Sequence, residues 1–176
     1  MAEINVNTPG ARWRTILSGG AVAGAIGGVV LSVYMVIVGV ARGENVWAGA
    51  KIAAYPFLGD RVMTPGFDAG AVALGLIDHF AVSIIWGILF ALAAFGLSRR
   101  ATVGLGAVWG IVVWLAMFYL VLPLVGAGNL VRGMPVGVAF IDHVIFGLTV
   151  GFGFLPFQRE RRERAKLSRR WRLRPA

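Results

Sequence analysis

The stretch AGAVALGLIDHFAVSIIWGILFALAAFGL, residues 69–97, is apolar along almost its whole length and contains one pair of ionisable residues, Asp78 and His79. A helix of this length is about 40 Å long, whereas the hydrocarbon core of a bilayer is about 30 Å thick. Carboxylates and imidazoles are costly to place in hydrocarbon, so they face the interior of a helix bundle rather than lipid. The stretch therefore predicts a transmembrane helix whose polar pair faces other helices.

Three further apolar stretches are long enough to cross a bilayer, at about residues 16–40, 101–125 and 136–157. The chain has 176 residues, of which 58% are hydrophobic, and its mean hydropathy is +0.78. A soluble domain of this size cannot bury four such helices. The sequence therefore predicts an all-α, polytopic membrane protein with a transmembrane domain in residues 1–158 and a basic tail in residues 159–176.

Basic residues are concentrated at three places along the chain, which carries a net charge of +9. Arg12 and Arg14 precede the first span, Arg99 and Arg100 separate the second from the third, and nine Lys or Arg residues lie within 159–174. All three places fall on one side of a four-span topology, and Lys and Arg mark the cytoplasmic side. We therefore expect both termini to be cytoplasmic and the tail to contact anionic lipid. A nucleic-acid partner is not favoured, because a basic run next to a span typically orients and anchors it.

The two halves of the chain resemble each other. GLIDHFAVSIIWG, residues 75–87, matches AFIDHVIFGLTVG, residues 139–151, and these segments hold the only two histidines. Gly-Ala-Val-x-Gly also occurs twice, at residues 20–24 and 106–110. Because each half contains two spans, two copies would have the same orientation, related by an axis along the membrane normal. The sequence therefore predicts two parallel helical-hairpin repeats in a four-helix bundle, in which equivalent faces of the second and fourth spans can meet near the axis.

Small residues at four-residue intervals indicate which helix faces pack closely. These predicted packing residues are Gly20, Gly24, Gly28, Ser83, Gly87, Gly106, Gly110, Gly147 and Gly151. His79 and His143 precede two of these series by four residues, so each histidine shares a face with them. We therefore expect both histidines to point into the bundle.

The two Asp-His pairs are the candidate functional residues. A rise of about 1.5 Å per residue puts His143 about 24 Å from the tail and so in the outer half of the bilayer. Neighbouring side chains leave a helix about 100° apart, so we expect no hydrogen bond within a pair. We expect instead that Asp78 faces His143 and that Asp142 faces His79. The plainest interpretation is a set of interhelical hydrogen bonds that lock the bundle.

Cofactor binding is a second interpretation of the same residues. His79 and His143 could be the axial ligands of one b-type haem, with the small residues nearby making room for the macrocycle. Alternatively, both histidines together with Asp78 and Asp142 could bind a divalent metal such as Zn, Cu(II) or Fe(II). Either group would make the chain an electron-transfer or metal-binding protein. A thiolate site is excluded, because the chain contains no cysteine.

A small ion or proton transporter is a third interpretation, since intramembrane Asp and His residues often line such paths. Beyond Ser83 and Thr149, however, few polar residues continue towards the cytoplasmic side. An enzyme is not favoured, because Ser83 lies on the same helix as His79 without an evident oxyanion donor. The sequence therefore favours a non-enzymatic accessory or assembly subunit that packs, through its glycine faces, against other membrane subunits or a second copy of itself.

The longest loop, between the first two spans, contains aromatic residues and chain breakers. A short interfacial helix is expected at about residues 46–55, with its aromatic side chains near the lipid headgroups. Asp68 follows Pro65-Gly66 and precedes the second span. We expect Asp68 to cap the amino end of that helix.

Four segments together resemble a group of small four-span bacterial inner-membrane proteins of unknown function. They are WAGAKIAAYPFLG, TPGFDAGAVALGLIDHFAVSIIWGILFA, WLAMFYLVLP and AFIDHVIFGLTVGF, and the likeness extends over about residues 20–154. The resemblance implies a multi-pass protein of the bacterial inner membrane with a four-helix fold. It implies no reaction and no cofactor.

Overall fold

The structure is a computed structural model that describes the backbone of residues 9–172 and the side chains of residues 10 and 12–158. Its long helices are α1 (Pro9–Ala41), α4 (Ala69–Ala94), α5 (Arg99–Ala116) and α8 (Val136–Arg172). The π-helical turn η2 (Met117–Val121) and α6 (Leu122–Leu124) extend α5. Four segments are long and apolar enough to cross a membrane: Arg12–Ala41, Ala69–Ala94, Arg99–Leu124 and Val136–Gln158. The predicted all-α architecture with four such helices is therefore confirmed, and α8 continues without a break into the basic tail.

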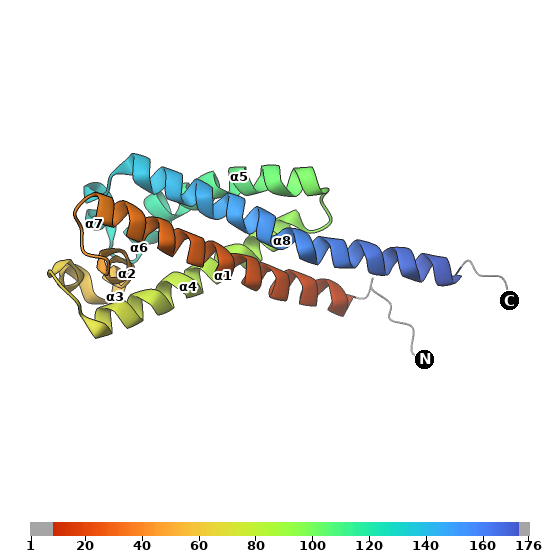
Figure 1. The fold of residues 1–176 in the computed structure, drawn as a ribbon, viewed down its shortest axis with the longest axis horizontal. Helices are drawn as coiled ribbons and strands as arrows, with labels where there is room; N and C mark the ends of the chain where they lie inside the picture. The colour runs from red at the N-terminus through yellow and green to blue at the C-terminus, as the bar shows by residue number, and fades with distance from the viewer. Residues whose placement is uncertain (1–8, 173–176) are drawn as a thin grey trace.

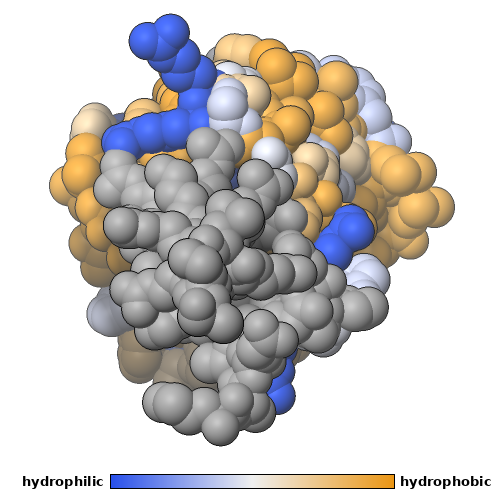
Figure 2. Space-filling view, turned by 90° about the vertical axis from the view of Figure 1, so that its right-hand side faces the viewer, coloured by the Kyte–Doolittle hydropathy of each residue, from blue (hydrophilic) through white to orange (hydrophobic). Residues whose placement is uncertain are grey.

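The four long helices follow the spatial order α4, α1, α8, α5. Helices α1 and α8 run side by side across the molecule, with α4 against α1 and α5 against α8 (Figure 1). Helices α4 and α8 make few backbone contacts, but equivalent side chains of the second and fourth spans, Phe90 and Phe154, do meet inside the bundle, with ring centroids 6.2 Å apart. Viewed from the end where the described chain begins and ends, the sides of the bundle are largely hydrophobic (Figure 2). We call this the tail end, and the opposite end the cap end.

Helix α1 lies in the middle of the order because it has two adjacent faces of small residues. On one face, a Cβ atom added to Gly20 would lie 2.6 Å from the Cα atom of Ile88 in α4. On the other face, a Cβ atom on Gly27 would lie 2.9 Å from the ring of Phe146 in α8. Contacts this short leave no room for a side chain, so each face admits one neighbouring helix. Gly27, on the second face, was not among the predicted packing residues.

Helices α5 and α8 approach each other through glycines in the same way. A Cβ atom on Gly147 would lie 2.6 Å from the Cα atom of Gly110, and one on Gly106 would lie 2.7 Å from the carbonyl oxygen of Gly147. The predicted packing glycines therefore contact helices of the same chain.

An aromatic layer crosses the bundle between the cap end and the tail end. The ring centroids of Trp86 and Trp109 are 5.9 Å apart, those of Trp109 and Phe90 are 6.0 Å apart, and those of Phe90 and Phe154 are 6.2 Å apart. Phe90 and Phe154 are fully buried. The layer joins α4, α5 and α8 and fills the space between them at this level.

Short helices cover the cap end: α2 (Ala48–Ala53), α3 (Tyr55–Leu58), the 3₁₀ turn η1 (Gly59–Met63) and α7 (Gly128–Gly133). The helix expected at about residues 46–55 is thus present as α2. It rests on α4 at Gly75, where an added Cβ atom would lie 3.0 Å from the carbonyl carbon of Ala50.

Asp68 caps α4 as predicted. Its Oδ1 atom accepts a hydrogen bond from the backbone N–H of Ala71 at 3.0 Å, and its Oδ2 atom lies 3.1 Å from the guanidinium of Arg61. The first bond satisfies one of the N–H groups that a helix start leaves without an intrahelical acceptor. The second ties the loop at the cap end to the start of the span.

Candidate functional site

The two Asp-His pairs line one cavity, which lies between α4 and α5 beneath the short helices of the cap end. Helices α4 and α5 are joined by a tight turn at Gly96, whose φ of 91° suits a residue without a side chain. They separate towards the cap end, and α1 and α8 pack against them on one side (Figure 1). The volume of the cavity is about 170 Å³. Its lining includes Leu31 and Met35 of α1, Asp78, His79, Ser83 and Trp86 of α4, Met117 and Phe118 of η2, and Asp142, His143 and Phe146 of α8. We call it the Asp–His cavity.

Asp142 and His143 form a hydrogen-bonded pair on α8. The Nδ1 atom of His143 lies 2.6 Å from Oδ1 of Asp142 and 2.7 Å from the carbonyl oxygen of Ala139. The expectation that sequence neighbours would not bond to each other is therefore wrong for this pair. The Cα–Cβ bonds diverge, but both side chains reach back over the preceding turn, where the Ala139 carbonyl lies. The carboxylate of Asp142 is almost completely buried, with 7% of the residue exposed.

His79 bonds to a different helix. Its Nε2 atom lies 2.9 Å from the carbonyl oxygen of Gly28 in α1. Gly28 lies against Ser83 of α4, and a Cβ atom on it would lie 3.0 Å from Ser83 Oγ. The absence of a side chain at Gly28 therefore lets the two helices approach closely enough for this bond. Asp78 is half-buried in the cavity wall and has no hydrogen-bond partner among the residues that the structure describes.

The two carbonyl groups determine which nitrogen of each neutral imidazole holds the proton. A carbonyl oxygen only accepts hydrogen bonds, so Nε2 of His79 and Nδ1 of His143 each donate one. The other nitrogens, Nδ1 of His79 and Nε2 of His143, have no bonding partner in the described part of the chain and are acceptors. The cavity thus offers two carboxylates and two acceptor nitrogens. None of the described side chains that line it is Lys or Arg.

Aromatic and thioether side chains make up most of the remaining wall. Trp86 and Phe146 lie seven residues after His79 and three residues after His143, spacings that return to the same helix face. This periodicity was a signal in the sequence that could have identified them. Phe118 packs edge-on against His143, with ring centroids 5.9 Å apart.

Phe118 reaches the cavity from the π-helical turn η2. The backbone N–H of Leu122 donates to the carbonyl of Met117, five residues back. Pro123 follows immediately and has no N–H to continue the α-helical pattern. Single π-helical turns are frequent at functional sites, and this one lies in the cavity wall.

The geometry of the described residues does not support the predicted cofactors. In the described residues, no three His, Asp or Glu side chains come close enough together to hold a metal ion. A haem is much larger than the cavity, whose 170 Å³ is below the ~300 Å³ of ordinary ligand pockets. His79 could also ligate only through Nδ1 while Nε2 donates to Gly28. The structure thus brings His79, His143, Asp78 and Asp142 to one cavity, but not into one ligand set.

The fold and the cavity together define a class: an all-helical protein with four helices suited to crossing a membrane and a small acidic cavity between them. Residues 14–165 match the family of unknown function DUF6789, and the chain belongs to that family. No curated protein and no solved structure matches the chain. The predicted group of membrane proteins of unknown function agrees with this result, while the bacterial inner membrane stays a prediction.

Proposed function

We propose that this protein binds a small organic cation in the Asp–His cavity. The observation that carries the proposal is the composition of the cavity wall, in which the carboxylates of Asp78 and Asp142 lie among aromatic side chains without a basic residue. A buried negative charge is costly unless a cation or hydrogen-bond donors compensate it. Asp142 has the imidazole of His143 as a donor, whereas Asp78 has no such partner among the described residues.

Aromatic walls favour an organic cation over a bare metal ion. Trp86, Phe118 and Phe146 present rings to the cavity, and the faces of such rings attract alkylammonium groups. A cavity of about 150 Å³ is large enough for benzene, so 170 Å³ accommodates one ring or a branched ammonium group. The acceptor nitrogens of the two histidines would receive N–H or O–H groups of the ligand.

The packing on the tail side of the cavity favours binding over transport. Trp86 lines the cavity and belongs to the aromatic layer, in which Phe90 and Phe154 are fully buried. A polar ligand would have to pass this layer to cross the bundle. We therefore favour a binding protein over the ion or proton transporter. If the basic residues face the cytoplasm, the cavity lies in the outer half of the membrane.

The accessory-subunit hypothesis receives less support from the helix faces. It rests on glycine faces that pack against a partner, yet Gly20 and Gly24 contact α4, and Gly106 and Gly110 contact α8. These faces are occupied within the chain. An internal duplication would explain why two similar pairs line one cavity, and it remains part of the proposal.

The two histidines allow a direct test by NMR of protein labelled with ¹⁵N-histidine in lipid nanodiscs. Benzylammonium is the probe, and benzoate and benzyl alcohol are its anionic and neutral analogues. We expect benzylammonium to shift the histidine resonances saturably, and Asp78→Asn to weaken its affinity about tenfold, or ~1.4 kcal/mol. Asp68→Asn removes the same charge outside the cavity and keeps a capping side chain, so its affinity should match that of the wild type. A response equal for benzoate and benzylammonium, or none to either, would refute the proposal.

A further inference from the structure

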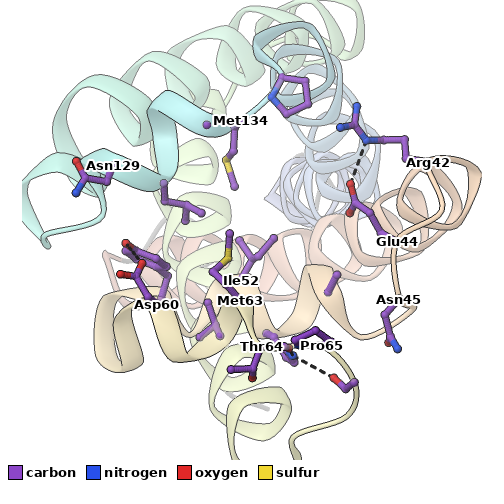
Figure 3. A pocket seen from close by; sticks show the side chains of 18 residues that line it. Arg42, Glu44, Asn45, Ile52, Asp60, Met63, Thr64, Pro65, Asn129 and Met134 are labelled. Carbon is purple, nitrogen blue, oxygen red and sulfur yellow. Dashed lines mark hydrogen bonds and ion pairs between the residues drawn. The ribbon is translucent and has the colours of Figure 1, made fainter.

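A second cavity lies directly on the cap side of the Asp–His cavity. It has a volume of about 610 Å³, within the ordinary range for small-molecule pockets. One wall is formed by α2, η1 and the following loop, and the other by α7 and the residues after it (Figure 3). We call this cavity the vestibule.

The vestibule wall is mostly apolar but includes several charged and polar side chains. The guanidinium of Arg42 lies 3.1 Å from the carboxylate of Glu44, and the hydroxyl of Tyr55 donates to Asp60 at 2.9 Å. Both interactions involve exposed side chains. The vestibule wall therefore contains more polar groups than the wall of the Asp–His cavity, which is largely apolar apart from its two pairs.

Three apolar side chains belong to the walls of both cavities. They are Ile52 of α2, Leu130 of α7 and Met134, which follows α7. Figure 3 shows Met134 and Ile52 on opposite sides of the vestibule. Leu130 is 8% exposed, so it fills the space between the cavities rather than facing solvent. These three side chains thus form the wall that the two cavities share.

We infer that the vestibule is the entrance to the Asp–His cavity and that Ile52, Leu130 and Met134 form the apolar barrier that a ligand must pass. The inference deepens the proposed function, because a water-borne cation needs a route that avoids lipid. The arrangement of the two cavities and of the three side chains that they share does not depend on which ligand binds.

The two walls of the vestibule differ in how firmly they are held. Lys51 on α2 is buried, and its Nζ atom donates to the carbonyl oxygens of Thr64 and Gly66, which ties α2 to the loop that follows η1. In contrast, α7 packs mainly against α6 and makes few contacts with the long helices. Displacement of α7 would move Leu130 and Met134 together. The barrier is therefore expected to open on the α7 side.

The absence of cysteine from the chain allows a clean accessibility test. Ala139→Cys places one thiol in the wall of the Asp–His cavity. The probe is a quaternary-ammonium methanethiosulfonate, which is cationic and does not cross membranes. In nanodiscs, adding Leu130→Ala or Met134→Ala should raise the rate of modification about tenfold, or ~1.4 kcal/mol off the barrier. Leu124→Ala is the matched control, because Leu124 is 76% exposed and lines neither cavity.

Equal rates in the barrier variants and the Leu124→Ala control would overturn the inference, and entry between α4 and α5 from lipid would take its place. A neutral, lipid-soluble maleimide should then react faster than the cationic reagent, whatever residue stands at position 130. Val82→Cys on α4 provides a second thiol in the same cavity should Ala139→Cys fail to fold. If the cavity does not bind organic cations, benzylammonium will not shift the histidine resonances, but the differences in modification rate will remain.

Discussion

The Nδ1 atom of His143 lies 2.6 Å from the Oδ1 atom of Asp142, whereas His79 has no hydrogen bond to the preceding Asp78. The same dipeptide thus adopts two arrangements on two helices. His143 bonds within α8, to its neighbour and to Ala139, while His79 bonds across to Gly28 of α1. Asp142 therefore has a hydrogen-bond donor, whereas Asp78 has none among the residues that the structure describes.

The two histidines should be opposite tautomers when neutral. Because the Gly28 and Ala139 carbonyls accept, His79 should carry its proton on Nε2 and His143 on Nδ1. The ¹⁵N chemical shifts of the two residues distinguish these forms, and the variant His79→Gln assigns the signals. Identical tautomers for both residues would contradict the hydrogen bonds to the Gly28 and Ala139 carbonyls.

Glycine substitutions should separate the tightly packed positions from the open ones. In Gly110→Ala, the new Cβ atom would lie 2.7 Å from the Cα atom of Val144, so α5 and α8 must move apart. We expect a loss of about 1–3 kcal/mol in the free energy of unfolding, as for other overpacked sites. Denaturation in mixed micelles provides the measurement.

Gly104→Ala, on the same helix, is the matched control. No atom lies within 4 Å of a Cβ added at Gly104. Alanine there should be neutral or should stabilise by up to about 1 kcal/mol, because it restricts the unfolded chain. If both alanine variants unfolded alike, close packing at Gly110 would be refuted.

A buried polar network at the tail end should contribute measurably to stability. The hydroxyl of Thr102 has two acceptors for its single proton, the carbonyl oxygen of Ser98 at 2.9 Å and Oε1 of Gln158 at 3.1 Å. The Nε2 atom of Gln158 donates to the carbonyl of Ala94 at 2.8 Å. Thr102→Val keeps the shape but removes the donor that the Ser98 and Gln158 oxygens share, at an expected cost of about 1 kcal/mol. Thr102→Ser keeps the hydroxyl and should retain most of the stability. Equal losses in the two variants would show that the methyl group matters rather than the hydroxyl.

The long helices could be predicted from the sequence because the length and hydropathy of the apolar stretches are enough to locate them. The expected spans at about residues 16–40 and 69–97 correspond to Arg12–Ala41 and Ala69–Ala94 in the structure. Asp68 was recognised as a cap because helix starts require an acceptor at that position. The spatial order of the helices could not be predicted from the sequence, because it depends on which of two adjacent small-residue faces of α1 packs against α4 and which packs against α8.

The site was only partly predictable for a related reason. The rare charges in apolar stretches pointed to Asp78, His79, Asp142 and His143, and all four line one cavity. Their partners include backbone carbonyls, such as that of Gly28, which every residue possesses and which no sequence pattern distinguishes. The vestibule depends on α7, a six-residue helix too short to produce a clear periodicity.

Lys51 should hold the loop after η1 in place. Lys51→Met removes the donor to the Thr64 and Gly66 carbonyls, so amide hydrogen exchange should accelerate in residues 59–68. Mass spectrometry of peptides from this segment measures the change. Arg42→Met is the comparison, since its exposed ion pair with Glu44 contributes at most about 1 kcal/mol and should leave exchange there unchanged. If the rate of amide hydrogen exchange in residues 59–68 were unchanged in Lys51→Met, contacts other than those of Lys51 would hold the loop in place.

The cap at Asp68 should make the stability of the cap end depend on acid. The N–H of Ala71, and after it the guanidinium of Arg61, lower the pKa of Asp68 from its ordinary value of 3.8. A carboxyl whose folded pKa is lowered stabilises the fold above its unfolded pKa, and this contribution is lost as the pH falls through the folded pKa. Unfolding temperatures measured at about pH 5 and about pH 3 should therefore differ more for the wild type than for Asp68→Asn, which caps without titrating. The same pH dependence in both proteins would mean that other carboxyl groups, and not Asp68, control the acid sensitivity.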